Sequence, residues 1–389
     1  MDILILNEKT ADSALVGLSE NKINKLISGW GRLTRKVHII CDPKFTTERK
    51  NNIELHNIGA VKTYRRGTML YFLTHLQYFI KVLLKAIEVI KKNPSIKFII
   101  NVSGHFSLGL ISVLISKICS RISLIRVTED TGVSLFYRKI RSSGISLIDR
   151  IIYYLTSLSE KFAFIFADKI ILAGLLENPE RYQKFGYKTV LIPDVVEEFN
   201  CKIKSKLEKK TIVYACRLEW EKDPITFLKS VQELSRTRDD FEGIIVGNGS
   251  LETIMRKYVN ANKLDAKVRF LKSLPHDQFI DFLSSAYVLV LTSWTEAMPN
   301  VVIEAFGCGV PVIAAKTRGP SYLIKEGVNG FLFDKSERSA LTKHINKILD
   351  DEKLRDWMSN NCRRDFEELL KKDFGGDAVQ KKYLLLIKN

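Results

Sequence analysis

Short apolar segments alternate with longer segments of helical character along the chain, and this alternation limits the fold more than any other feature. Strands that alternate with helices form parallel sheets covered by helices, the arrangement of α/β proteins. A first series of such apolar segments comprises Asp2–Leu6, Val37–Cys41, Phe98–Val102, Ser123–Val127 and Lys169–Leu172. We therefore expect a parallel sheet in the first half of the chain.

A second series follows the lysine-rich stretch 197–210, which we interpret as a linker between domains. It comprises Thr211–Cys216, Glu242–Val246, Val268–Leu271, Val288–Thr292, Val312–Ala314 and Phe331–Phe333. The sequence therefore predicts two Rossmann-like, doubly wound α/β domains, 1–196 and 211–370. The last segment, 371–389, is expected to be a helix that returns to the first domain. Two such domains would face each other across a cleft, with ligands bound at the carboxyl ends of their strands.

Composition bounds the class of protein. The 389 residues are 46% hydrophobic and 27% charged, as in a globular chain long enough for two cores. The six cysteines form no C-x-x-C pair and no secretory signal opens the sequence, so we expect a cytoplasmic protein with free thiols. The longest apolar stretch, 69–90, is interrupted by Lys81, Lys85 and Glu88 and does not predict a membrane-spanning helix.

The net charge of +17 is placed unevenly. Residues 1–200 carry 29 basic and 18 acidic side chains, whereas residues 201–389 carry 32 and 26. A basic first domain attracts anionic partners, either phosphorylated substrates or an anionic membrane surface. The sequence shows no basic and aromatic module of a recognised nucleic-acid-binding type, so no nucleic-acid partner is expected.

The segment 69–92 has polar residues spaced three or four apart and predicts an amphipathic helix. One interpretation is a helix that packs on the core of the first domain. The other is a surface helix that touches anionic lipid beside Lys62, Arg65 and Arg66, peripherally on the inner face of the plasma membrane. The sequence alone leaves both open.

Two glutamates in the second series, Glu296 and Glu304, bracket the start of a predicted helix. Pro299 suits a helix start, and the positive end of a helix favours a phosphate. Candidate donors to that phosphate are the free N–H groups of Asn300, Val301 and Val302, with Met298 in the preceding loop. Glu304, one turn along, is placed to accept hydrogen bonds from ribose hydroxyls, and Glu296 from a sugar hydroxyl. Alternatively, the two are solvated carboxylates.

Further candidates follow other strands of the second series. Arg217 and Lys222 come after its first strand, where they can neutralise charge on a leaving diphosphate, unless they are ordinary surface charges. Gly247 lies in Gly-Asn-Gly, which lacks the third glycine of a dinucleotide fingerprint and favours a tight turn near the donor. Leu271 ends the next strand and is also a donor-binding candidate.

These motifs together resemble the glycosyltransferases of family 4, which have the GT-B fold. R-L-x-x-x-K after a strand, V-G-N-G-S, E-x7-E, G-V-P-V-I-A and E-G-V-N-G-F-L-F occur in that family's order over roughly residues 208–335. The resemblance implies a retaining, metal-independent transfer of a hexose or N-acetylhexosamine from a nucleotide sugar to a saccharide. It also implies that Glu296 binds the donor sugar, Glu304 the ribose, and Arg217 with Lys222 the diphosphate.

One segment of the second domain resembles particular subgroups of this family. The Gly-Pro-Ser core of residues 317–324 resembles subgroups that build bacterial surface polysaccharide, often from UDP-galactose-type donors. Tyr322 stands there where family members usually have a glutamate. We therefore expect a UDP-sugar donor and a saccharide acceptor linked to a lipid.

The first domain departs further from the family pattern. The loop after its first strand holds only Gly17 where members have two adjacent glycines, and Asp130 occupies the place of a sugar-facing histidine. Asp130 could accept a hydrogen bond from a donor hydroxyl and counts among the catalytic candidates. His105 is either structural or acceptor-binding, and Arg65 with Arg66 are further acceptor candidates.

Neither a cofactor nor a metal ion is expected. The chain contains no D-x-D pair and no His, Cys and Asp cluster with metal-ligand spacing, and the nucleotide sugar is a substrate. Two other functions share the predicted architecture, a nucleotide-sugar epimerase of GT-B fold and a non-catalytic nucleotide-sugar-binding protein. The epimerase is disfavoured because its signature residues are not evident. Asp130 and the loop around Gly17 motivate the non-catalytic protein.

Overall fold

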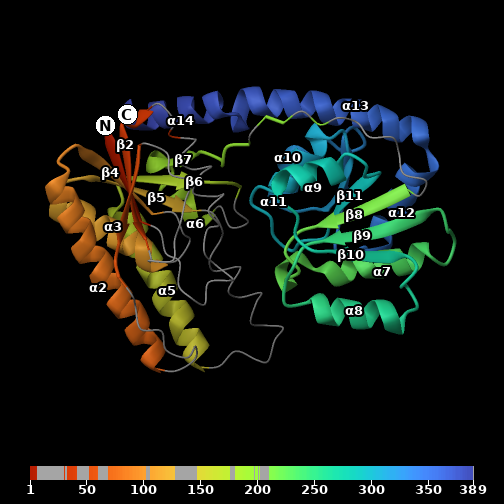
Figure 1. Cartoon of the computed structure of the whole chain (residues 1–389), viewed down its shortest axis with the longest axis horizontal. Helices are drawn as coiled ribbons and strands as arrows, with labels where there is room; N and C mark the ends of the chain where they lie inside the picture. The colour runs from red at the N-terminus through yellow and green to blue at the C-terminus, as the bar shows by residue number, and fades with distance from the viewer. Residues whose placement is uncertain are drawn as a thin grey trace. The chain divides into compact units, whose positions relative to one another are not determined.

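The computed structural model describes residues 1–6, 30, 33–41, 52–59, 69–101, 106–127, 147–175, 180–196, 198–199, 201 and 210–388. The chain divides into two compact units, each built on its own sheet (Figure 1). Unit 1 comprises residues 1–174, 178–196 and 373–389, and unit 2 comprises residues 175–177 and 197–372.

Unit 1 contains a parallel sheet with the strand order β3-β2-β1-β4-β5-β6-β7. The strands are β1 Asp2–Leu6, β2 Lys36–Cys41, β3 Ile53–Asn57, β4 Ile96–Asn101, β5 Ile122–Val127, β6 Lys169–Leu172 and β7 Thr189–Leu191. Its described helices are α2 Met69–Lys92, α3 Phe106–Cys119, α5 Leu147–Phe166, α6 Glu180–Gln183 and α14 Gly376–Lys388. The five strands predicted from the first series are all present, and β3 and β7 extend the sheet at its two edges.

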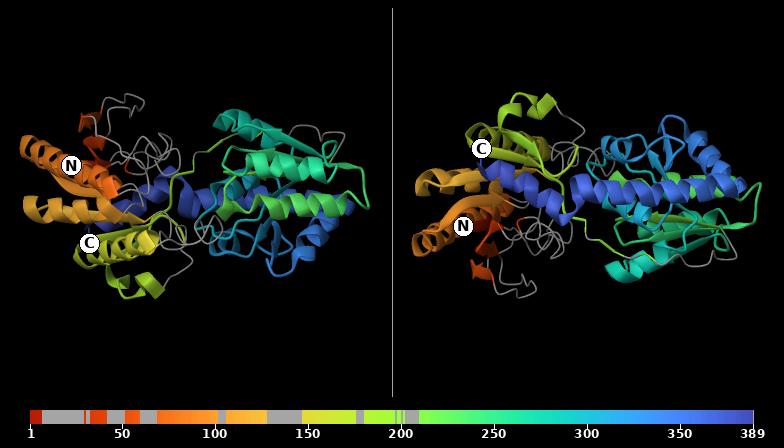
Figure 2. Two further views of the ribbon diagram at one scale, coloured as in Figure 1. Left: turned by 90° about the horizontal axis from the view of Figure 1, so that it is seen from below. Right: turned by 90° about the horizontal axis from the view of Figure 1, so that it is seen from above.

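Helices cover both faces of the unit 1 sheet. On one face α3 lies between α2 and α5 (Figure 2), and α2 buries Val82, Ala86 and Val89 against the strands. The other face packs against Trp30 and α14, whose Tyr383 ring lies 4.4 Å from the Trp30 ring. The last helix therefore belongs to the core of unit 1.

A buried arginine reinforces this return of the chain. Arg126, at the end of β5, donates to Tyr383 Oη at 3.1 Å and pairs with Asp194 at 2.6 Å. It also donates to the backbone oxygen of Ile192 at 3.2 Å. A buried guanidinium needs this number of acceptors because every unpaired N–H in the interior costs free energy.

Unit 2 contains a parallel sheet with the strand order β10-β9-β8-β11-β12-β13. The strands are β8 Lys210–Ala215, β9 Phe241–Val246, β10 Val268–Leu271, β11 Val288–Leu291, β12 Val312–Ala315 and β13 Gly330–Phe333. The helices are α7 Pro224–Leu234, α8 Glu252–Ala261, α9 His276–Leu283, α10 Asn300–Gly307, α11 Arg318–Leu323, α12 Arg338–Asp350 and α13 Glu352–Leu369. All six strands predicted from the second series are present.

The central strands β11 and β12 are apolar and buried along their whole length because helices cover both faces of a parallel sheet. Residues of α7, α8 and α12 join the strands in one buried cluster that includes Phe227, Met255 and Ile345. A π-helical turn, Leu370–Phe374, follows α13 and contains the point where unit 2 gives way to unit 1.

Candidate functional site

The strand order of unit 2 reverses between β8 and β11. At such a switch point the loops after two neighbouring parallel strands run to opposite faces of the sheet, and ligands bind in the crevice that this leaves. Arg217 and Lys222 follow β8, and Glu296 follows β11. The topology therefore places three predicted donor-site residues in the two loops that flank the switch point.

Lys222 and Glu296 form an ion pair here, with 2.7 Å between Nζ and Oε1. Ser293 Oγ donates to the same carboxylate oxygen at 2.7 Å. The two charged side chains are only 16% and 12% exposed. Burial alone would lower the pKa of Lys222, but the Glu296 carboxylate outweighs it and raises that pKa above its ordinary value. Lys222 is therefore protonated at neutral pH and paired with Glu296.

The backbone around Lys222 is fixed by contacts with neighbouring strands. Its carbonyl accepts hydrogen bonds from Tyr214 Oη at 2.7 Å and from Thr292 Oγ1 at 3.0 Å. A 3₁₀ turn, Trp220–Lys222, ends at Asp223, which adopts a left-handed conformation with φ of 49°. These contacts hold the ammonium group in place before any ligand arrives.

Arg217 lies beside this pair but is more open to solvent. Its Nη2 atom is 3.0 Å from Glu221 Oε1, and the side chain is 46% exposed. The charge of Arg217 acts on Lys222, whose pKa it lowers slightly against the effect of Glu296. Two cations therefore lie close together after β8, one buried and one partly exposed to solvent.

The glycine loop after β9 packs directly on the loop after β8. Gly247 has a φ of 145°, and a Cβ atom there would lie 2.0 Å from the carbonyl oxygen of Cys216. The Gly247 N–H donates to the carbonyl oxygen of Leu271 at 3.1 Å, and the Leu218 N–H donates to that of Asn248 at 2.9 Å. Only glycine permits this approach, which positions Arg217 and Lys222 rather than a dinucleotide.

Helix α10 begins at Asn300 after Pro299 and presents its positive end near Glu296. The prediction of three free N–H groups is wrong for Val302, because its N–H donates to the carbonyl oxygen of Pro299 at 3.0 Å and its side chain is buried. Asn300 and Val301 are half-buried, and their N–H groups have no acceptor within the helix. They are the two backbone donors left for an anion.

Glu304 lies one turn further along α10 and is 12% exposed. Its Oε1 atom is 3.7 Å from His276 Nδ1, at the start of α9. Sequence analysis missed His276, and it missed Ser293 beside Glu296. Both follow a strand at its carboxyl end, which is the signal that could have drawn attention to them.

Helix α11 supports the Glu296 loop from behind. The Gly319 N–H donates to the carbonyl oxygen of Glu296 at 2.8 Å, and a Cβ atom at Gly319 would lie 2.6 Å from that oxygen. Met298 is half-buried in the same loop. Tyr322, where the family pattern has a glutamate, is 44% exposed on α11. The Gly-Pro-Ser segment therefore acts on the position of Glu296.

The candidates of the first domain lie outside the described residues. These are Gly17, Arg65, Arg66, His105 and Asp130.

The chain is similar to known proteins over the region that contains this site. Residues 195–365 match the family model of the glycosyl transferases group 1, and this range contains every described site residue. One curated relative is the GalNAc-alpha-(1->4)-GalNAc-alpha-(1->3)-diNAcBac-PP-undecaprenol alpha-1,4-N-acetyl-D-galactosaminyltransferase of Campylobacter jejuni, 30% identical over 47% of this chain and 49% of that protein. Another is the UDP-Gal:alpha-D-GlcNAc-diphosphoundecaprenol alpha-1,3-galactosyltransferase of Escherichia coli, 28% identical over 40% of this chain and 41% of that protein.

These alignments span about half the length of the curated relatives. Similarity of fold extends over the whole chain. The sucrose-phosphate synthase of Thermosynechococcus elongatus superposes on 100% of this chain and 98% of its own, with a TM-score of 0.76 and 18% identity. The two doubly wound units therefore form the GT-B fold, as the sequence motifs predicted.

Proposed function

We propose that this chain, a member of the glycosyl transferases group 1 through residues 195–365, is a retaining glycosyltransferase that uses a nucleotide sugar. The observation that carries the proposal is the ion pair of Lys222 and Glu296 at the switch point of the unit 2 sheet. A buried cation and carboxylate, beside a helix start with free N–H groups, match the phosphates and hydroxyls of such a donor.

The donor is oriented by groups that follow three strands, β8, β10 and β11. The N–H groups of Asn300 and Val301 donate to the diphosphate, and the dipole of α10 adds to the attraction. Arg217 and Lys222 neutralise the charge that grows on the diphosphate as the glycosidic bond breaks. Glu304 accepts hydrogen bonds from the ribose hydroxyls, with His276 beside it. Glu296 receives a hydroxyl of the sugar.

The transfer itself then requires no protein nucleophile. The bond between the anomeric carbon and the diphosphate breaks, and the acceptor oxygen forms its bond on the same face of the sugar. The departing phosphate oxygen takes the proton of the acceptor hydroxyl, so the products are a nucleoside diphosphate and a glycoside of unchanged configuration. The protein contributes positioning and positive charge, without a metal ion.

A uridine diphosphate sugar is the proposed donor, with a hexose or N-acetylhexosamine as the group transferred. The name of the relative from E. coli specifies UDP-galactose, and that of the relative from C. jejuni specifies an N-acetylgalactosaminyl group. Both names also specify an acceptor on a polyprenyl diphosphate. We extend this acceptor class to the present chain and place it in bacterial surface polysaccharide synthesis.

A lipid-linked acceptor accounts for an exposed apolar face of unit 1. Along α5, Tyr154, Leu158, Phe162 and Phe166 recur every fourth residue, and all four are exposed, Tyr154 by 67%. The Phe162 and Phe166 rings stack on each other at 6.4 Å. A helix of a globular protein normally turns polar residues to water, so an apolar outer stripe marks a contact surface.

The neighbouring helices extend this surface. Ile80 and Leu84 are exposed on α2, and Leu114 and Ile118 on α3. Figure 2 shows α2, α3 and α5 side by side. The exposed lysines on these helices are Lys91, Lys92, Lys117 and Lys161. Apolar side chains among lysines suit an anionic lipid surface. The amphipathic helix 69–92 is thus both a core helix and part of this α2–α3–α5 face.

Contact with the membrane is proposed at its surface only. Among the described helices, none combines the length and apolar character that crossing a bilayer requires. The proposed location is the cytoplasm, with peripheral attachment to the plasma membrane.

The activity is tested with the full chain, UDP-galactose, UDP-glucose and their N-acetylated counterparts, and a polyprenyl diphosphate saccharide. Release of UDP that depends on acceptor, in the presence of a chelator, and an NMR spectrum showing the donor's anomeric configuration in the product are expected. Conversion of the UDP sugar to an epimeric UDP sugar without acceptor would favour an epimerase. Binding of a UDP sugar with neither transfer nor hydrolysis would establish the non-catalytic alternative.

The membrane surface is tested by flotation with vesicles of phosphatidylglycerol and of phosphatidylcholine. The chain should float with the anionic vesicles only, and Phe162→Ser combined with Phe166→Ser should abolish this. Trp357→Ser, which changes an equally exposed aromatic residue in unit 2, is the control. Flotation that is unaffected by the α5 variant would show that α5 does not contact the membrane.

A further inference from the structure

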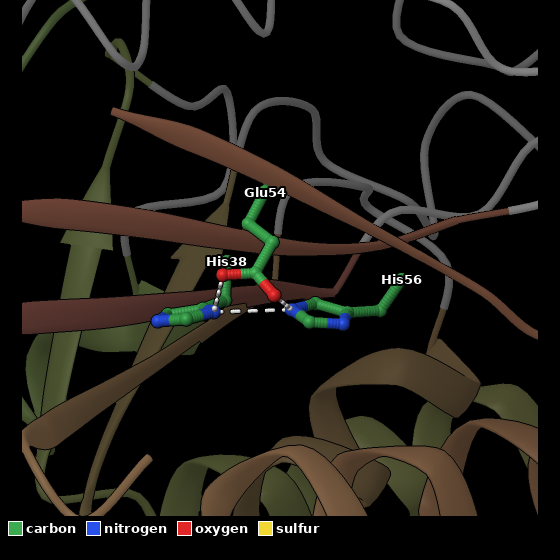
Figure 3. A group of neighbouring side chains, drawn as sticks. All are labelled: His38, Glu54 and His56. Atoms are coloured by element: carbon green, nitrogen blue, oxygen red, sulfur yellow. Dashed lines mark hydrogen bonds and ion pairs between the residues drawn. The ribbon is translucent and has the colours of Figure 1, made fainter. Parts of the chain in front are cut away.

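Three side chains of metal-ligating type converge on β2 and β3 in unit 1 (Figure 3). In the parallel register, His38 of β2 lies opposite Glu54 of β3, and Ile40 lies opposite His56. Because side chains of a strand alternate between its faces, Glu54 and His56 point to the same face. His38 joins them from the neighbouring strand.

The ligand atoms of the three residues face one another. His38 Nδ1 and His56 Nε2 are 3.0 Å apart, and the Glu54 carboxylate lies 3.6 Å from the first and 3.9 Å from the second. His38 is fully buried, and its other nitrogen, Nε2, has no hydrogen-bond partner among the described residues. The two rings therefore present one nitrogen each to a shared point.

The residue types suit a metal ion, because two imidazole nitrogens and one carboxylate lie within 4.8 Å of one another. Two neutral imidazoles and a carboxylate are the ligand forms that Zn²⁺ takes in proteins.

We propose that His38, Glu54 and His56 form a zinc-binding site, with a water molecule as the fourth ligand. Tetrahedral Zn²⁺ with Zn–N bonds of about 2.0–2.1 Å requires roughly 3.3 Å between two ligand nitrogens, a few tenths of an ångström more than the present separation. Glu54 is half exposed, so its side chain has room to turn an oxygen toward the ion.

A proton shared between the rings is the competing explanation of their close contact. In that case one imidazole N–H donates to the other ring, which accounts for the 3.0 Å distance without the carboxylate. A metal ion uses all three groups at once. The two explanations differ in whether Glu54 contributes, and this decides the experiment.

The ion would act on unit 1 and not on sugar transfer. Among the described strands β3 forms the edge of its sheet, hydrogen-bonded to β2. A metal ion held by both strands would fasten this edge, because a ligand that binds only the folded state stabilises it. The described residues of the donor site all belong to unit 2.

The test uses the purified full chain, stripped with a chelator and titrated with Co²⁺ as a visible probe and with Zn²⁺ as its competitor. We expect one ion per chain, the absorption of four-coordinate Co²⁺, its displacement by Zn²⁺ and a raised melting temperature. Glu54→Gln and His56→Gln should each bind at least about tenfold more weakly, since even outer-shell partners contribute 10–100-fold to metal affinity.

The matched control is His344→Gln, a histidine of unit 2 that stacks on Phe331 and lies outside the cluster. It should bind like the unchanged chain. Circular dichroism confirms that each variant is folded, and the variants avoid His38 because it is buried. Absence of bound Co²⁺, or equal binding by the unchanged chain and both variants, would overturn the site. Glycosyl transfer in the presence of chelator is scored separately, so failure of either proposal is recognised on its own.

Discussion

Two buried cations of this chain, Arg126 in unit 1 and Lys222 in unit 2, each pair with one carboxylate at the carboxyl end of a parallel sheet. Arg126 is 2% exposed and is held by Asp194, by Tyr383 Oη and by the carbonyl oxygen of Ile192. Lys222 is 16% exposed, and among the described residues Nζ has one recorded hydrogen bond, to Glu296. Among the described residues Arg126 thus has three acceptors and Lys222 has one.

This difference separates a structural ion pair from one that is ready for a ligand. An ammonium group has three donors, so Lys222 can keep Glu296 and still bind an anion. Arg126 has its acceptors within the protein, and a ligand there would have to displace one of them. The number of partners, more than burial, therefore indicates which pair serves binding.

The largest expected effect concerns the stability of unit 1. Asp194→Ala leaves the Arg126 guanidinium buried without its carboxylate, and loss of one member of a buried pair costs about 3–5 kcal/mol. Urea unfolding followed by circular dichroism should show this loss. Asp240→Ala removes an exposed partner of Arg238 and should cost about 0–1 kcal/mol. Equal losses for the two variants would contradict the structural role of Asp194.

The second effect concerns turnover. Lys222→Ala should lower the rate of sugar transfer about 100- to 1,000-fold, the usual cost of removing one group that stabilises developing charge. Its free energy of unfolding should fall less than that of Asp194→Ala, because Glu296 keeps its hydrogen bond from Ser293. Lys267→Ala is the control. Lys267 has nearly the same exposure as Lys222, but it lies at the opposite end of the sheet, where it pairs with Asp239. A large loss of stability with normal turnover would place Lys222 in the same class as Arg126.

A smaller effect is expected for donor affinity. Glu304→Gln keeps the shape of the side chain but removes its charge, and hydrogen bonds to charged groups contribute about 1.5–3 kcal/mol. The dissociation constant of the nucleotide sugar, measured by calorimetry, should therefore rise about 10- to 100-fold. Glu252→Gln, at an exposed pair with Arg256 on α8, should leave it unchanged. Unaltered affinity in Glu304→Gln would show that the Glu304 carboxylate does not bind the ribose.

The smallest effect is a dependence of stability on pH. The pKa of Lys222 is raised in the folded state above its ordinary value of 10.5, so the folded chain retains this proton longer than the unfolded chain does. The stability that the pair adds is complete below pH 10.5 and falls as the pH rises through the folded-state pKa. The unfolding free energies of the unchanged chain and of Lys222→Met should converge as the pH rises through the folded-state pKa of Lys222. A constant difference between the two free energies over this pH range would contradict the coupling of stability to the Lys222 proton.

Much of the fold follows from apolar runs in the sequence, and the two strands that were missed show the limit. β3, with the sequence Ile-Glu-Leu-His-Asn, and β7, with three residues, are the edges of the unit 1 sheet. An edge strand is covered less completely, so it lacks the continuous apolar run of a central strand. Because β3 was not predicted from the sequence, nothing indicated that Glu54 and His56 lie beside His38.

The candidate site shows a similar limit. Motif spacing predicted Glu296, Glu304, Arg217 and Lys222, because each motif is local in the sequence. The partners Ser293 and His276, and the hydrogen bond that occupies the Val302 N–H, depend on loop conformation and strand order. Residue spacing predicts neither the loop conformation nor the strand order.

The place of α14 in unit 1 also has a consequence for the order of events on the ribosome. Val379, Tyr383 and Leu386 pack with Ile3 and Trp30 in one core, so this core is complete only when the last helix has been made. Unit 2 lies between them in the sequence and can fold earlier. At about 5–20 residues per second, completion of this core follows the synthesis of β1 by on the order of tens of seconds. The nascent first half must therefore be kept from aggregating, either by chaperones or by its own high charge.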